Sequence, residues 1–190
     1  GENADTPSPY DFAMGGEGTS PSLPVGANGT LIRPEHPVMV DMNGNFNGYM
    51  TDMTRCYAPA EPNPQAARLN ALSERICDTL AEMMRPGAAA SDLYAKALEI
   101  ATEAGMEQYF MGHRSHAGFV GHGIGIEVNE LPVIAPRSRD ILAAGNVIAL
   151  EPKFVVPGLG AVGIENTYIV KENGRAECIT NAPTDIVRLS

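Results

Sequence analysis

The stretch VMVDMNGNFNGYMTDMTR, residues 38–55, is typical of a β-hairpin that carries one acid on each arm. Apolar residues 38–40 lead into Asp41, residues 43–48 are rich in Asn and Gly, and Asp52 lies on the returning arm. Turn residues between two apolar arms predict a hairpin. If the chain turns at Phe46-Asn47, Asp41 and Asp52 lie directly opposite each other. Their Cβ atoms would then be about 4.5–5.5 Å apart on one face of the sheet.

A second predicted hairpin presents another pair of acids. With a turn around Pro157-Gly158-Leu159, Glu151 and Glu165 face each other. Like charges so close repel, and apolar neighbours raise the cost of burying them. A single acid on a strand is usually solvated on an outer face, but two matched pairs indicate that a cation compensates their charge.

His122 is the fifth candidate ligand, because glycines on both sides of it let the backbone approach a ligand closely. Four carboxylates and one imidazole form a hard ligand set that favours Mn²⁺, Co²⁺, Fe²⁺ or Zn²⁺. Carboxylates that bridge two ions could hold them about 3.5–4 Å apart, with a nucleophilic water between them.

Composition excludes several classes of function. The chain has 190 residues and a net charge of −10, which argues against nucleic acid or an anionic membrane as a partner. Apolar stretches are broken by Gly and Pro, so none approaches a spanning helix of about 20 residues.

The three cysteines, Cys56, Cys77 and Cys178, are far apart and lack the spacing of a metal site. We interpret them as buried thiols in a reducing compartment, which favours a cytoplasmic location.

The chain divides into an irregular lead-in, residues 1–37, and a domain portion, residues 38–190. The lead-in is rich in Gly, Pro, Ser and Asn, and we expect it to be a remnant of a preceding part of a larger protein. In the second portion, Asn63 with Pro64 and then Ser91 are predicted N-caps of two helices, which end near Pro86-Gly87 and Gly105. Later strands are expected at residues 124–128, 147–156, 161–164 and 167–170. The order of elements predicts an α+β fold.

The order and context of the five candidate ligands resemble the metal signature of the "pita-bread" metallopeptidases. That family includes methionine aminopeptidases, Xaa-Pro aminopeptidases, prolidases and the non-peptidase creatinases. Asp52 within Thr51–Arg55, His122 within Gly121–Gly125, and Glu151-Pro152 match its motifs. Gly48-Tyr49 and the run after His122 are similar to the Xaa-Pro aminopeptidase and prolidase branch.

The resemblance implies a pita-bread fold, incomplete at its N-terminal side, and a centre with two divalent ions, preferably Mn²⁺. Asp41 would bind one ion, Asp52 and Glu165 would bridge both, and His122 and Glu151 would complete the second site. Glu151 would also be the general base for the bridging water. The implied activity is hydrolysis of peptide bonds in small peptides, and we expect the protein to be a homodimer.

Three departures from the family pattern affect its peptide chemistry rather than its ligands. Asn129 stands where the family usually has a His, seven residues after the metal His. An Asn can donate a hydrogen bond but cannot carry the proton of an imidazole. Val25 lies where prolidase-like members have a Pro–His–His motif, and Gly163 replaces a common Arg. His116, or His113, could substitute for the missing His, so the candidate catalytic residues are Glu151, Asn129 and His116.

Three functions remain open from the sequence. The first is a peptidase similar to Xaa-Pro aminopeptidases or dipeptidases. The second is a metalloenzyme of the same fold with non-peptidase chemistry on a small metabolite, which the three departures favour. The third is a non-catalytic binding module, which the retained acids disfavour, because they would repel one another without a metal.

Overall fold

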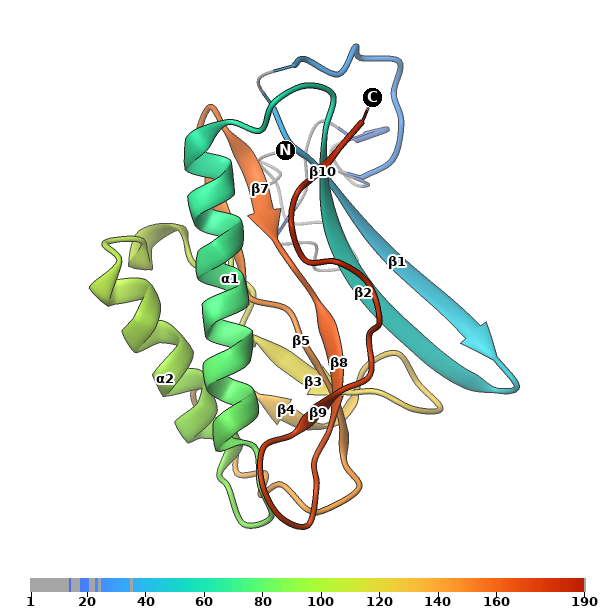
Figure 1. Ribbon diagram of the computed structural model, residues 1–190, viewed down its shortest axis with the longest axis vertical. Helices are drawn as coiled ribbons and strands as arrows, with labels where there is room; N and C mark the ends of the chain where they lie inside the picture. The colour runs from blue at the N-terminus through green and yellow to red at the C-terminus, as the bar shows by residue number, and fades with distance from the viewer. Residues whose placement is uncertain (1–13, 15–17, 21–22, 24, 35, 190) are drawn as a thin grey trace.

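The computed structural model describes residues 14, 18–20, 23, 25–34 and 36–189. Strands β1 (Val38–Phe46) and β2 (Tyr49–Ala58) form a long antiparallel hairpin, and β10 (Val187–Arg188) adds to β2 in parallel. In Figure 1 this hairpin projects away from the rest of the molecule. The first predicted hairpin is thus present, and β1 begins at the start of the predicted domain portion.

The turn of the β1–β2 hairpin lies one residue later than the sequence analysis expects. Phe46 pairs with Tyr49, and Asn47 and Gly48 form the turn with φ of 52° and 88°. Two positive φ values in a two-residue Asn-Gly loop are typical of a type I′ turn, which fits the twist of the strands. Asp52 therefore faces Asn43 and not Asp41, so the predicted pairing of the two acids is wrong. The correction spans two positions of register, so both acids keep the same face.

The second predicted hairpin has the expected register but is divided into two strand pairs. Strand β5 (Val147–Leu150) pairs with β8 (Asn166–Ile169), and β6 (Lys153–Val156) pairs with β7 (Gly160–Gly163). Leu150 faces Asn166, and Lys153 faces Gly163. Glu151 and Glu165 lie between the two pairs, at equivalent places on the two arms. We call this element the double hairpin.

Strand β3 (Gly121–Gly123) lies between β4 (Glu130–Ile134) and β5, in a sheet ordered β4-β3-β5-β8-β9, where β9 is Glu177–Cys178. The strand predicted at residues 124–128 is wrong, because these residues form the bend between β3 and β4. Between residues 121 and 129 only the glycine-flanked segment Gly121–Gly123 is a strand, and β4 begins at Glu130.

Two helices cover the sheets from one side (Figure 1). Helix α1 (Pro64–Met83) begins after Asn63, whose side chain accepts a hydrogen bond from the Gln65 amide as predicted, and it packs against β6 and β7. Helix α2 (Ala90–Glu103) begins after Ala89 rather than at Ser91, and it packs against β4. The short helix η1 (Glu107–Tyr109) follows. The core between the helices and the sheets contains Ile76, Leu80, Leu93, Ile100, Phe154 and Val162.

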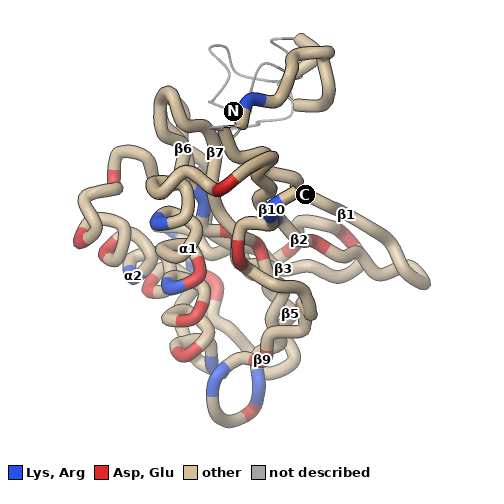
Figure 2. Tube along the Cα trace, turned by 45° about the horizontal axis from the view of Figure 1, so that its top comes forward, with Lys and Arg blue, Asp and Glu red and all other residues tan. Residues whose placement is uncertain are grey.

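Several acidic residues of the described chain lie along α1 and α2, and Asp41 and Asp52 lie on the β1–β2 hairpin (Figure 2). Among the described residues, no helix combines the length and the hydrophobicity of a membrane span.

All three cysteines are free thiols. Cys56 and Cys77 are buried as predicted, but Cys178 is exposed, so its predicted burial is wrong. It lies on β9, a two-residue strand at the edge of the sheet.

Candidate metal centre

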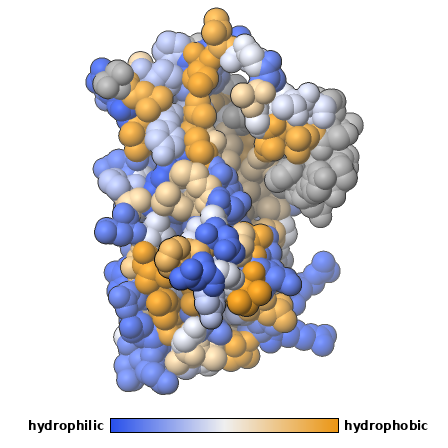
Figure 3. Space-filling model, turned by 90° about the vertical axis from the view of Figure 1, so that its right-hand side faces the viewer, coloured by the Kyte–Doolittle hydropathy of each residue, from blue (hydrophilic) through white to orange (hydrophobic). Residues whose placement is uncertain are grey.

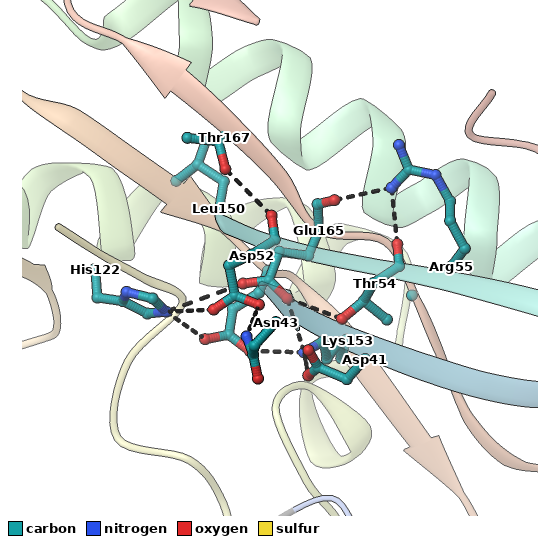
Figure 4. Close-up of polar contacts among 12 residues, drawn as sticks. Asp41, Asn43, Asp52, Thr54, Arg55, His122, Leu150, Lys153, Glu165 and Thr167 are labelled. Atoms are coloured by element: carbon teal, nitrogen blue, oxygen red, sulfur yellow. Dashed lines mark hydrogen bonds and ion pairs between the residues drawn. The ribbon is translucent and has the colours of Figure 1, made fainter. Parts of the chain in front are cut away.

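The candidate ligands come from separate elements that meet where the β1–β2 hairpin crosses the double hairpin. Asp41 lies on β1, Asp52 on β2 and His122 on β3, while Glu151 follows β5 and Glu165 precedes β8. Figure 4 shows the side chains of His122, Asp52 and Glu165 pointing toward one another, with Lys153 beside Asp41. The chain therefore gathers its candidate ligands into one cluster, although the predicted pairing of the first two is wrong.

We call one half of this cluster the histidine side, where carboxylate oxygens surround His122 Nε2. Nε2 lies 3.4 Å from Glu151 Oε1, 3.8 Å from Asp52 Oδ2 and 3.9 Å from Glu165 Oε1. The other ring nitrogen, Nδ1, lies 3.0 Å from the carbonyl oxygen of Gly123. A carbonyl only accepts hydrogen bonds, so Nδ1 carries a proton and donates a hydrogen bond to this oxygen. The bond fixes the ring with Nε2 toward the acids. Metal-binding histidines are oriented in the same way.

The other half is the lysine side, which the sequence analysis missed. Lys153 Nζ lies 2.8 Å from Glu151 Oε2, 3.1 Å from Asp41 Oδ2 and 3.5 Å from Glu165 Oε2. Lys153 is only 2% exposed, so its ammonium group is a buried internal cation. Glu151 and Glu165 each direct one oxygen to either side. The predicted register could have located Lys153, because it places this residue directly opposite Gly163.

Gly163 explains how the stem of Lys153 reaches the acids. A Cβ atom at residue 163 would lie 2.8 Å from Lys153 Cγ and 2.6 Å from the Pro152 carbonyl oxygen, so a larger residue would clash. Glycines also matter around His122. A Cβ at Gly121 would lie 2.5 Å from the Ala149 carbonyl oxygen, and one at Gly123 would lie 2.5 Å from that of Leu131. The two glycines thus let β3 pack closely against its neighbours, while the predicted approach of this backbone to a ligand stays a prediction.

Arg55 fastens the β1–β2 hairpin to the double hairpin. Its Nη1 donates to the carbonyl oxygens of Thr54, at 2.7 Å, and of Glu165, at 2.8 Å. Its Nη2 donates to Asn166 Oδ1 at 2.7 Å, and its Nε donates to the Pro183 carbonyl oxygen at 2.6 Å. Thr54 Oγ1 donates to Glu165 Oε2 at 2.8 Å. These contacts of Thr54 and Arg55 hold Glu165 against β2, the strand that also carries Asp52.

The charges perturb one another strongly. Burial, helped by Glu165 and Asp41, raises the pKa of Asp52 to about 8. Burial also raises the pKa of Glu165 to about 7, although Lys153 opposes this shift. Glu151 shows the reverse, because Lys153 and His122 outweigh its burial and lower its pKa to about 2. Near neutral pH, Asp52 therefore retains a proton and Glu165 is partly protonated, and a bound cation would displace these protons.

The histidine side fits a divalent cation. Glu165 is 1% exposed, yet its Oε1 accepts no hydrogen bond from the described residues. This atom, one Asp52 oxygen and one His122 nitrogen all lie within 4.8 Å of one another. A buried acceptor without a donor requires another partner. Carboxylate oxygen and imidazole nitrogen bind Zn²⁺, Mn²⁺ or Co²⁺ at about 2.0–2.2 Å, a spacing that this group could close around an ion.

Two predicted catalytic residues lie away from these contacts. His116 is exposed, and its Nδ1 lies 2.9 Å from the Phe110 carbonyl oxygen. Asn129 is exposed in the bend between β3 and β4. Within the described chain, neither makes a hydrogen bond or ion pair with the cluster. Their roles stay predictions.

A cleft of about 710 Å³ opens beside Asp52. It lies between the β1–β2 hairpin and the bend after β3, and it is mostly apolar. Its lining includes Tyr49, Met50, Ile124, Ile126, Leu131 and Ile179. Figure 3 looks onto the side from which the hairpin projects and shows patches of hydrophobic side chains there. The volume is in the range of small-molecule sites, about 300–1,000 Å³.

The chain is similar to several known proteins. The model of metallopeptidase family M24 matches residues 3–172. The probable dipeptidase PepE of Mycobacterium tuberculosis is 34% identical over 157 residues, which cover 82% of this chain and 40% of the relative. The Xaa-Pro dipeptidase of Pyrococcus furiosus is 34% identical over 137 residues, which cover 72% of this chain and 38% of the relative.

Among solved structures, the prolidase from Pyrococcus horikoshii matches with a TM-score of 0.75 and 27% identity. That match covers 92% of this chain and 46% of the prolidase chain. The chain therefore spans less than half the length of these relatives. It has the pita-bread fold of the part that it matches. Taken with the ligand cluster, the match over residues 3–172 shows that this chain belongs to metallopeptidase family M24.

Proposed function

We propose that this chain is the metal-binding part of an enzyme that hydrolyses peptide bonds in small peptides, as an Xaa-Pro dipeptidase or aminopeptidase does. The observation that carries the proposal is the convergence of Asp52, Glu151, Glu165 and His122 Nε2 beside a cleft. Membership of family M24 supports it, as do relatives named Xaa-Pro dipeptidase and dipeptidase.

In this proposal a divalent ion, when bound, polarises the scissile carbonyl and makes a water nucleophilic. Glu151 lies at the centre of the cluster and accepts the proton that this water loses, then returns it to the leaving amine. Lys153 holds Glu151 in its charged form, because its ammonium group lies 2.8 Å from Glu151 Oε2. Arg55 and Thr54 keep Glu165 in place against the β1–β2 hairpin.

The cleft restricts the substrate to a small one. Its apolar lining, with Met50 and Ile124 near Asp52, suits an apolar side chain or a proline ring. The proposal requires at least one divalent ion, with Mn²⁺ the preferred metal. The resemblance implies two ions, bridged by Asp52 and Glu165, and this number stays a prediction. A homodimer and a cytoplasmic location also stay predictions.

A second candidate function is non-peptidase chemistry on a small metabolite. Asn129 favours it, because the usual His is missing and the Asn is exposed in the bend after β3. A binding module without catalysis is disfavoured by Glu165 Oε1, a buried acceptor without a donor in the described chain, which lies beside Asp52 and His122 and calls for a bound cation.

Incubation of the full-length Mn²⁺-loaded protein with Xaa-Pro dipeptides, other dipeptides and Xaa-Pro-Yaa tripeptides tests the proposal. We expect cleavage of at least one class, its loss with a chelator, and its restoration by Mn²⁺. Glu151→Gln should lose activity by more than about 100-fold, because the proton acceptor is removed. Glu127→Gln, at an exposed position, should match the wild type. A metal-loaded protein that cleaves no peptide of the panel would contradict the proposal.

A further inference from the structure

The cluster has two positions for positive charge, and the chain itself fills one of them. On the lysine side, Lys153 Nζ contacts Asp41 Oδ2, Glu151 Oε2 and Glu165 Oε2. On the histidine side, the second oxygens of Glu151 and Glu165 join Asp52 Oδ2 around His122 Nε2. The same two glutamates therefore serve both positions, each with one oxygen.

Two further donors from the chain hold carboxylate oxygens next to the lysine side. Asn43 Nδ2 donates to Asp52 Oδ1 at 2.5 Å, so only Oδ2 of Asp52 faces His122. Thr54 Oγ1 donates to Glu165 Oε2 at 2.8 Å. A metal ion on this side would have to displace the ammonium group from the oxygens that hold it, and it would be repelled by that group at short range.

Lys153 cannot easily move out of the cluster. Every residue of β6 is buried, and Lys153 lies directly opposite Gly163, over which its side chain passes. Withdrawing the ammonium group from its three carboxylates would leave a buried charge without partners, which is strongly unfavourable. The ammonium group is therefore a fixed positive charge on this side of the cluster.

The histidine side is different, because it holds the buried acceptor without a donor. Glu165 Oε1 accepts no hydrogen bond from the described chain, and it lies within 4.8 Å of an Asp52 oxygen and a His122 nitrogen. We propose that this centre binds one divalent ion, on the histidine side, and that the Lys153 ammonium group takes the place of a second ion. The inference refines the proposed function, since it fixes the number of ions with which that chemistry operates.

Metal counting on the full-length protein tests this inference. The metal-free protein is titrated with Mn²⁺, bound metal is counted by mass spectrometry, and the electron paramagnetic resonance spectrum is recorded. We expect one bound Mn²⁺ per chain and the six-line spectrum of an isolated ion. Two ions per chain with an exchange-coupled spectrum would overturn the inference, as would no binding at all.

Lys153→Met removes the charge but keeps much of the stem, and it should raise the count from one Mn²⁺ to two. Lys96→Met, at a partly exposed lysine on α2, is the matched control and should keep one. If folded Lys153→Met still binds one ion, the ammonium group does not replace a second ion. If that variant fails to fold, the wild-type count decides alone.

Peptide hydrolysis on the same samples separates this inference from the proposed function. One ion without hydrolysis would overturn the proposed function and support the count. Two ions with hydrolysis would do the opposite.

Discussion

The two hairpins that build the centre differ in how the chain holds their acids. In the four strands of the double hairpin every residue except Val147 and Ile169 is buried, and Glu165 is 1% exposed. The β1–β2 hairpin projects from the molecule, its tip residue Phe46 is 74% exposed, and the Asp41 side chain is 46% exposed. One hairpin thus forms a buried half of the site, while the other carries Asp52 to it and is held there by the contacts of Arg55 and Thr54. We therefore expect a candidate ligand on these hairpins to contribute more to metal affinity the more deeply its side chain is buried.

The largest effect is expected at the buried end of this comparison. Glu165→Gln should weaken Mn²⁺ binding by more than about 100-fold, above the range for an outer partner of a metal ligand. The amide removes the negative charge that faces His122 at 3.9 Å. Isothermal titration measures the affinity, with Glu127→Gln as an exposed control. A loss below 10-fold would mean that Glu165 is not a ligand.

The connection between the two hairpins can be broken at Arg55. Arg55→Met should lower the free energy of unfolding by about 2–3 kcal/mol, because it leaves buried carbonyl groups of Thr54 and Glu165 without their charged donor. Urea denaturation measures the change. Arg75→Met is the control, and it should cost less than about 0.5 kcal/mol because its side chain is 59% exposed. Equal stability of the two variants would show that Arg55 does not fasten the hairpins.

Stability of the metal-free protein should depend on pH through the acids that face each other across the two hairpins. The pKa of Asp52 is raised from 3.8 to about 8, and that of Glu165 from 4.5 to about 7. A raised pKa means that the folded state binds protons that the unfolded state has released. Stability therefore falls as pH rises from about 5 to 8. Glu151, with its pKa lowered to about 2, adds stability that is lost only in acid.

Thermal unfolding in the presence of a chelator measures this dependence. The melting temperature should fall between pH 5 and pH 8, and Mn²⁺ should raise it more at pH 8 than at pH 5. Asp52→Asn should flatten the profile. A melting temperature that stays level or rises over this range in the wild type would contradict the assignment.

The smallest effect is expected at Asp41, on the exposed hairpin. Its ion-pair partner is Lys153, at 3.1 Å, and the Asp41 side chain is 46% exposed. Asp41→Asn should therefore change Mn²⁺ affinity by less than about 10-fold, the lower end for an outer partner. Asp52→Asn should lose more than about 100-fold, as expected for a ligand that faces His122. Equal losses in the two variants would show that Asp41 binds the ion directly.

The same two hairpins show how far the sequence predicts the structure. The register of the double hairpin follows from its Pro157-Gly158 turn and was predicted correctly, which places Glu151 and Glu165 together. The turn of the other hairpin was misplaced, because Asn47-Gly48 adopts positive φ at both residues in preference to Phe46-Asn47. The acids keep a common face because the correction is two positions of register, so the cluster was predicted although the pairing was wrong.

Lys153 and Arg55 are the two residues of the cluster and its surroundings that the sequence pattern does not reveal directly. A lysine on a strand usually points to solvent, and only the position of Gly163 across the strand pair reveals why this one is buried. The role of Arg55 depends on carbonyl groups at residues 165 and 183, more than 100 positions away in the chain. Backbone acceptors carry no signature in the side-chain pattern.

Anomalous diffraction from crystals of the full-length protein grown with Mn²⁺ tests the metal centre most directly. We expect one peak, about 2.0–2.3 Å from His122 Nε2 and shared with Asp52, Glu151 and Glu165. The Lys153 ammonium group should remain beside Asp41. No peak at His122 would contradict the metal centre itself, and a second peak beside Asp41 would contradict the role of Lys153.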